Sequence, residues 1–176
     1  LEADLDINLS EEGQYHLELY AETHGILAKL APWHGTFETH GRLNKKMRQA
    51  KPALHQSSTT WRDELEIQKY KYNEDGSFAA YLVQDEHDDG TKPRPIDMAL
   101  ASETTDILTA TLKAMYQVTD SGECGGTSEV FDGKRRFEVT FKKQEEVYLE
   151  RTKYNLYQGQ ACKCTVEVIP KGGKWH

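Results

Sequence analysis

The chain has 176 residues, with 22 basic and 29 acidic side chains and a formal net charge of -7. This length suits one domain with a hydrophobic core, so we predict a single β-rich domain over residues 1–176. The acidic balance argues against a nucleic-acid partner, and no apolar run is long enough to span a membrane.

Apolar and polar residues alternate along most of the chain, which is typical of strands with one buried face. In chain order this pattern predicts strands over residues 1–9, 15–21, 37–43, 57–61, 65–72, 77–84 and 134–141. Turns are predicted at SEEG (10–13), at NEDG (73–76) and at Asp132-Gly133, a strong hairpin signal. Because strand alternation starts at Leu1 and the chain stops soon after its last strand, we expect both ends to be truncated.

One segment, residues 104–117, favours a helix because its apolar residues form a single stripe. Thr104 or Thr105 is expected to cap this helix, with Asp106 in its first turn. A shorter helical turn is expected over residues 25–33, and residues 85–97 are expected to form an exposed loop. About ten strands with one main helix predict a mainly β fold: an antiparallel open barrel or a curled (spiral) sheet whose inner face the helix covers.

The three cysteines offer several kinds of site. Cys162 and Cys164 alternate within one predicted strand, so both are expected to face the core together with Val166 and Val168. Their Cα atoms would lie about 6.5–7 Å apart with parallel side chains, so they are poorly placed to bond to each other, whereas either can bond to Cys124.

A disulfide that closes a loop of about 40 residues would stabilise the domain by roughly 3–4 kcal/mol and imply an oxidising compartment. The alternatives are a metal clip, a redox pair and three reduced core cysteines. The metal clip lacks a fourth ligand, and the redox pair lacks a C-x-x-C motif at a helix start.

No histidine, acidic or glycine-rich motif indicates a reaction. His34 and His40 share a strand face but lie roughly 20 Å apart, too far to share an ion. Four further histidines are scattered along the chain, and each is expected to be a surface or interfacial imidazole: His16, His24, His55 and His87. No phosphate loop, dinucleotide fingerprint or G-x-S-x-G elbow is present. We therefore predict no catalytic residue, no metal ligand and no cofactor.

Three stretches of the second half follow one another in an order and spacing found in a known family. They are DILTATL (106–112), GECGGTSEVFDGKRRFEVTF (122–141) and YNLYQGQACKCTVEVIPKGGKW (154–175). An earlier stretch, ETHGILAKLAPWHGTFETHGRL (22–43), is similar to the opening of that family. On these residues the chain resembles the bacterial "domain of unknown function 3108" family over nearly its whole length.

The resemblance marks motif positions that are candidate structural or binding residues: Asp106, Thr109, Phe131, Asp132, Gly133, Arg135, Arg136, Tyr157 and Gly159. It also matches Cys124 and Cys164, and so implies a disulfide between these two with Cys162 as the free thiol. Members of the family usually carry a signal peptide and are exported to the periplasm, and their fold is expected to be an open β barrel or spiral. We expect Arg136 to pair with a carboxylate on a neighbouring strand.

The expected function is that of a non-enzymatic periplasmic protein of the cell envelope. It would be a binding or scaffold module that holds an apolar ligand or a segment of an envelope protein on its inner face. The alternative is a hydrolase of envelope polymers, which requires an acid and base pair brought together in a pocket from distant residues. A third possibility is a structural interaction protein in which the first strand, residues 1–9, is an exposed edge that pairs with a partner protein.

Overall fold

A computed structural model describes residues 2–44, 49–85, 90–153 and 157–175 of the chain. Seven strands form an antiparallel sheet in chain order: β1 (Glu2–Leu9), β2 (Gln14–Glu22), β3 (Trp33–Asn44), β4 (Gln49–Trp61), β5 (Glu64–Tyr72), β6 (Phe78–Asp85) and β7 (Lys92–Pro93). A second antiparallel sheet has the order β10-β9-β8 and contains β8 (Thr127–Phe131), β9 (Arg135–Leu149) and β10 (Gly159–Gly173). The helices are α1 (Ile26–Leu30), α2 (Met98–Ala101) and α3 (Ile107–Ser121).

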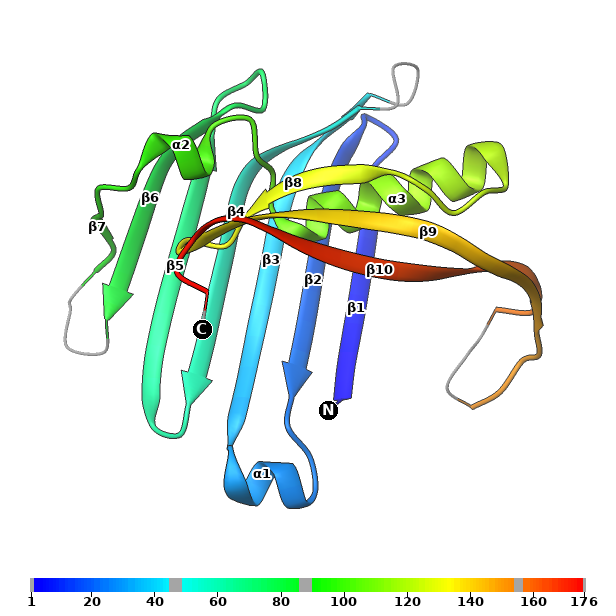
Figure 1. The fold of residues 1–176 in the computed structure, drawn as a ribbon, viewed down its shortest axis with the longest axis horizontal. Helices are drawn as coiled ribbons and strands as arrows, with labels where there is room; N and C mark the ends of the chain where they lie inside the picture. Colours follow the sequence, from blue (N-terminus) through cyan, green and yellow to red (C-terminus); the bar gives the residue numbers. More distant parts are fainter. Residues whose placement is uncertain (1, 45–48, 86–89, 154–156, 176) are drawn as a thin grey trace.

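The three-stranded sheet and α3 lie across one face of the seven-stranded sheet (Figure 1). We call this face the inner face and the opposite one the outer face. The seven-stranded sheet does not close into a barrel. The prediction of a mainly β, antiparallel curled sheet with one main helix is therefore confirmed. Among the described residues, no helix is long and apolar enough to cross a bilayer.

Helix α3 covers the inner face through its apolar stripe. Leu108 and Leu112 of the helix pack against Tyr15 and Leu17 of β2 and against Leu43 of β3, and all five side chains are buried. The odd-numbered residues of β2 and β3 point inward, which is the alternation that the sequence predicts. Burial of large apolar side chains between helix and sheet supplies the main stabilisation of this region.

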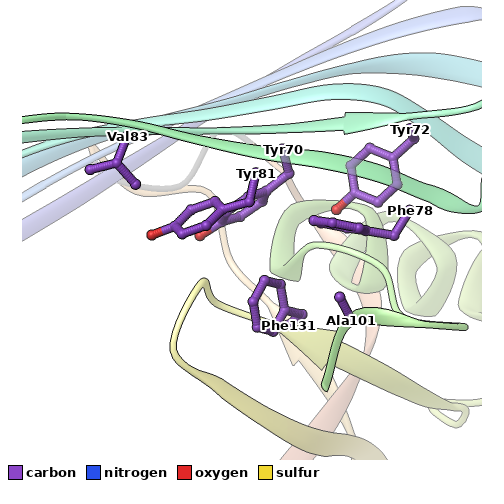
Figure 2. Close-up of a cluster of buried hydrophobic side chains, with 7 residues drawn as sticks. All are labelled: Tyr70, Tyr72, Phe78, Tyr81, Val83, Ala101 and Phe131. Carbon is purple, nitrogen blue, oxygen red and sulfur yellow. The ribbon is translucent and has the colours of Figure 1, made fainter. Parts of the chain in front are cut away.

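An aromatic cluster joins the two sheets (Figure 2). Phe131, the last residue of β8, stands edge-on to Phe78 with ring centroids 5.7 Å apart and to Tyr81 with centroids 6.2 Å apart. Tyr70 and Tyr72 of β5 complete the cluster, which is buried. Such tilted and edge-on pairs add to the stabilisation from area burial alone. The second sheet is thus attached to the first through Phe131.

Helix α3 begins later than the sequence predicts. Its N-cap is Asp106, not Thr104 or Thr105, because the extended Thr105 forms a parallel β-bridge with Val130 that holds it outside the helix. The helix ends at Ser121, and Gly122, which caps it, adopts a left-handed conformation with φ of 73°. The short helical turn expected within residues 25–33 is present as α1.

Two stretches are less buried than their alternation predicts. Leu5 and Leu9 of the edge strand β1 are about two-fifths exposed, since α3 packs mainly on β2, β3 and β4. Val166 and Val168 of β10 are half exposed rather than in the core. The predicted loop over residues 85–97 contains the two-residue strand β7, and its residues 86–89 lie outside the described residues.

Candidate functional site

A cavity of about 310 Å³ lies between the inner face of the seven-stranded sheet and the β8–β9 hairpin. We call it the inner cavity. Its apolar walls include the rings of Phe37, Tyr70, Phe131 and Phe137, and its polar lining includes His55, Ser57, Thr59, Gln68, Asp106, Asp132, Lys134 and Arg135. Four of the predicted motif residues therefore line one space: Asp106, Phe131, Asp132 and Arg135.

Asp106 is the centre of a buried hydrogen-bond network beside the cavity. Its Oδ1 accepts hydrogen bonds from the backbone N–H of Thr109 and from the hydroxyl of Thr39, both at 2.9 Å. Its Oδ2 accepts the hydroxyl proton of Thr109 at 2.7 Å. The carboxylate is 1% exposed, so these bonds replace the water that it loses on folding. Asp106 and Thr109, predicted as motif residues, thus fix the start of α3 on the sheet.

The network continues to two further buried side chains. The Tyr15 hydroxyl lies 2.9 Å from Thr109 Oγ1, and His55 Nδ1 lies 2.7 Å from Thr39 Oγ1. Because Thr39 donates its one proton to Asp106, it accepts from Nδ1 of His55 and leaves Nε2 as the proton-accepting nitrogen. The His55 ring stacks on Tyr70, with centroids 5.1 Å apart. His55 is 4% exposed, so the prediction of a surface or interfacial imidazole is wrong.

Burial shifts the pKa values of the network. Desolvation lowers the pKa of His55, and the negative charge of Asp106 offsets only part of this effect. Desolvation, with a smaller contribution from Asp106, raises the pKa of the Tyr15 hydroxyl far above its ordinary value. Both side chains are therefore neutral at physiological pH.

The lowered pKa of His55 predicts a loss of stability in weak acid. Below about pH 6.5 the unfolded chain binds a proton at this histidine that the folded chain does not. The free energy of unfolding therefore falls as the pH is lowered, by at most about 1.4 kcal/mol per pH unit from this group. Urea unfolding between pH 7.5 and pH 5 is expected to show a shallower pH dependence in His55→Gln than in the wild type. Equal slopes in the wild type and in His55→Gln would contradict the assignment.

The turn between β8 and β9 lies directly on the seven-stranded sheet. Gly133 has a φ of 89°, and a Cβ atom built there would lie 2.7 Å from Gln68 Oε1 and 2.8 Å from the Tyr81 hydroxyl oxygen. Glycine is thus required for the backbone conformation and for the close approach. The predicted Asp132-Gly133 turn is present, and it encloses one side of the inner cavity.

Asp132 organises the charged side of the cavity. Its Oδ1 accepts the backbone N–H groups of Lys134 and Arg135, and its Oδ2 accepts the Nε–H of Arg135 at 2.8 Å. The guanidinium of Arg135 also lies over the ring of Trp175, 4.9 Å from its centroid. Arg135 is therefore held in place by protein groups.

Arg136 points away from the inner cavity and has a structural role. Its Nε donates to Glu129 on the neighbouring strand β8 at 2.9 Å, the pairing that the sequence predicts. Its Nη1 donates to the backbone carbonyls of Ala99 and Ser102 at the end of α2. The two remaining motif residues lie far from the inner cavity: Tyr157 precedes β10 and Gly159 is its first residue. The Tyr157 hydroxyl donates to the Gln160 carbonyl.

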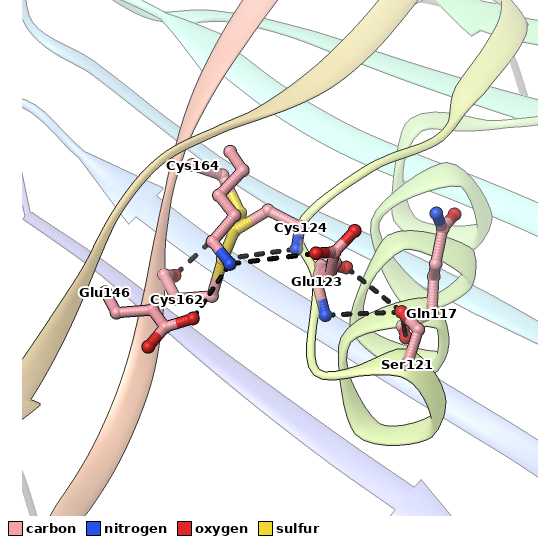
Figure 3. The surroundings of a disulfide bond; sticks show 8 residues. Gln117, Ser121, Glu123, Cys124, Glu146, Cys162 and Cys164 are labelled. Carbon is pink, nitrogen blue, oxygen red and sulfur yellow. Dashed lines mark hydrogen bonds and ion pairs between the residues drawn. A yellow bond between two sulfur atoms is a disulfide. The ribbon is translucent and has the colours of Figure 1, made fainter.

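The three cysteines meet beyond the C-terminal end of α3 (Figure 3). The Cys124 sulfur lies within bonding distance of the sulfurs of both Cys162 and Cys164 on β10. The corresponding Cα–Cα distances, 6.0 Å and 5.8 Å, both suit a disulfide. One sulfur forms one disulfide, so the two pairings are alternatives. The expected approach of Cys124 to the last strand is observed, while the choice of Cys164 with Cys162 free stays a prediction.

Two groups of described side chains have the composition and proximity of metal ligands. One is the cysteine cluster, which when reduced is one donor short of a closed tetrahedral site. The other is His16, Glu38 and His40. The prediction that His16 is an isolated histidine is wrong, because His16 lies opposite His40 on the adjacent strand.

Comparison with known proteins identifies one family. The family model described as "Protein of unknown function (DUF3108)" matches residues 2–174. No curated protein and no solved structure matches the chain.

Proposed function

We propose that this chain, which belongs to the DUF3108 family, is an exported, non-enzymatic binding protein of the bacterial cell envelope. Its ligand would be an apolar group held in the inner cavity. The observation that carries this proposal is the position of the cavity, between two sheets and beside the residues that the family motif marks. Ligand sites typically lie in such partly apolar clefts with a few fixed polar groups.

The size and lining of the cavity define the expected ligand. A volume of about 310 Å³ is at the small end of the roughly 300–1,000 Å³ typical of ligand sites. We therefore expect one apolar group, such as the end of an acyl chain or an apolar side chain of a partner segment. The rings of Phe37, Tyr70 and Phe131 would contact that group, and the polar residues of the lining would fix its orientation.

Export to the periplasm is supported by the cysteine cluster. A disulfide from Cys124 to β10 persists in an oxidising compartment and is rare in the cytosol. The periplasmic location remains part of the proposal and rests on this chemistry and on the family resemblance.

Binding of an apolar probe tests the proposal. Ser57 faces inward and lines the cavity, and Ser58 is the next residue on β4 and points to the outer face. Ser57→Phe is expected to fill the cavity and weaken binding of a fluorescent fatty acid by about tenfold or more, a loss of at least about 1.4 kcal/mol. Ser58→Phe is the matched control and should bind as the wild type does.

Solvent extraction of the wild-type protein from its native source, followed by mass spectrometry, should also recover a bound apolar molecule. Should Ser57→Phe unfold, the smaller Ser57→Val gives the same comparison. A folded wild type that binds no probe and yields no extracted molecule would rule out the apolar-ligand function.

Hydrolysis of envelope polymers is the second candidate, favoured by the linked His55, Thr39 and Asp106 beside the cavity. It ranks second because His55 is 4% exposed, and a polymer needs wider access. If the protein is a hydrolase, envelope polysaccharides or peptides should be cleaved by the wild type and not by His55→Gln. Absence of cleavage by the folded wild type would exclude this candidate.

A further inference from the structure

Three side chains meet on the outer face of β2 and β3, away from the inner cavity. His16 on β2 lies directly opposite His40 on β3, and Glu38 precedes His40 by two residues on the same face. Nε2 of His16 and Nε2 of His40 lie 2.8 Å and 2.9 Å from the same Oε1 of Glu38. The two imidazole rings are stacked, with centroids 4.2 Å apart and planes 4° from parallel. Two ring nitrogens therefore point at one carboxylate oxygen.

We propose that His16, Glu38 and His40 bind a divalent first-row transition ion of the Zn²⁺ class. Two imidazole nitrogens and one carboxylate oxygen are a donor set that Zn²⁺ accepts and that leaves positions for water. Calcium and magnesium prefer sets of oxygen donors, so they are not expected to compete.

The spacing of the donors suits such an ion. Metal–ligand bonds of about 2.0–2.2 Å place neighbouring donor atoms about 3 Å apart, close to the separations observed here. The side chains of His16 and Glu38 are about one-third exposed and that of His40 about one-half, so small rotations can admit an ion. The strand backbone fixes the three attachment points.

The charge around the site favours a cation. Asp6 on β1 lies opposite Glu18 on β2, and Glu18 lies opposite Glu38 on β3, so three carboxylates stand side by side on the outer face. Like charges directly opposite each other destabilise a sheet. Within the described part of the chain, none of the three forms a salt bridge with lysine or arginine. A bound dication would relieve this repulsion.

His24 provides a matched comparison on the same protein. Its Nε2 lies 2.8 Å from Glu22 Oε1 and 3.1 Å from Glu2 Oε2, so it also pairs with carboxylates. Its side chain is about as exposed as that of His40, but no second imidazole nitrogen joins it in a ligand group among the described residues. His24→Ala therefore removes a histidine of similar setting without removing a proposed ligand.

Isothermal titration of the untagged full chain with Zn²⁺ tests the proposal. We expect one ion per chain to bind through these residues, with affinity reduced about tenfold or more in His40→Ala and in Glu38→Gln. Removal of even an outer-shell partner of a metal site typically costs about 10–100-fold in affinity. The double variant His16→Ala/His40→Ala should lose the site, and His24→Ala should retain it.

A spectroscopic measurement separates this site from the cysteine cluster. Co²⁺ bound to imidazole and carboxylate gives no thiolate charge-transfer band, whereas Co²⁺ on the cysteines would give one. Zn²⁺ should also shift the imidazole NMR signals of His16 and His40 selectively. The proposal is overturned by the absence of Zn²⁺ binding, by unchanged binding in the double variant, or by an equal loss in His24→Ala.

Discussion

Replacing Asp106 by alanine is expected to lower the free energy of unfolding by about 3–5 kcal/mol, a loss comparable to breaking a buried polar network. The substitution removes the carboxylate that accepts three hydrogen bonds. The buried hydroxyls of Thr39 and Thr109 then lose the acceptor to which they donate. It also removes the N-cap of α3, which covers the inner face. Urea unfolding followed by circular dichroism measures the loss.

Asp97→Ala is the matched control for this experiment. Asp97 caps α2 through the backbone N–H of Ala99, but this cap is exposed to water. Its removal is expected to cost only about 1 kcal/mol. Asp106→Asn retains one carbonyl acceptor, so its loss in the free energy of unfolding should lie between those of Asp106→Ala and Asp97→Ala. Equal effects of Asp106→Ala and Asp97→Ala would show that the network adds nothing to an ordinary cap.

Removing Cys124 should have the second large effect. Either of its disulfides would close a loop of about 40 residues, so Cys124→Ser is expected to cost about 4 kcal/mol. Because both other cysteines are within reach of Cys124, Cys162→Ser and Cys164→Ser should each leave one disulfide and cost much less. The double variant Cys162→Ser/Cys164→Ser should match Cys124→Ser.

Thermal unfolding of the oxidised proteins gives the comparison, with the same set under reducing conditions as the control. Reduction should lower the unfolding temperature of the wild type to that of Cys124→Ser. A wild type whose stability is unchanged by reduction would show that no disulfide holds the loop after α3 to β10.

Much of the fold was predictable because alternation along a strand is a local property. The main helix and the Asp132-Gly133 turn follow from patterns within a few residues. The approach of Cys124 to the last strand, 38 to 40 residues further along the chain, was predicted instead from the three cysteines and the geometry that a disulfide requires. The cap of α3 was not predictable in this way, since Thr104, Thr105 and Asp106 are all good N-caps. The bridge from Thr105 to Val130, a contact distant in sequence, decides among them.

The place of His55 in the polar lining of the inner cavity was not predictable for a related reason. A register shift pairs His40 with Leu54 but Gly41 with Pro52, so Ala53 is an extra residue in β4. This bulge turns His55 inward, where simple alternation from the buried Pro52 would turn it outward. The meeting of His16 and His40 likewise depends on the register of β2 against β3, which no pattern within one strand encodes.

Peptide mapping under non-reducing conditions, on protein purified from its native source, tests most directly whether the domain is closed by a disulfide formed outside the cytosol. Free thiols are first alkylated at acidic pH. Trypsin cleaves after Lys163 and so separates Cys162 from Cys164, which identifies the partner of Cys124. We predict that the Cys124 peptide is linked to the peptide of one of these two cysteines. Three alkylated, unlinked cysteines would contradict both the disulfide and the export of the protein.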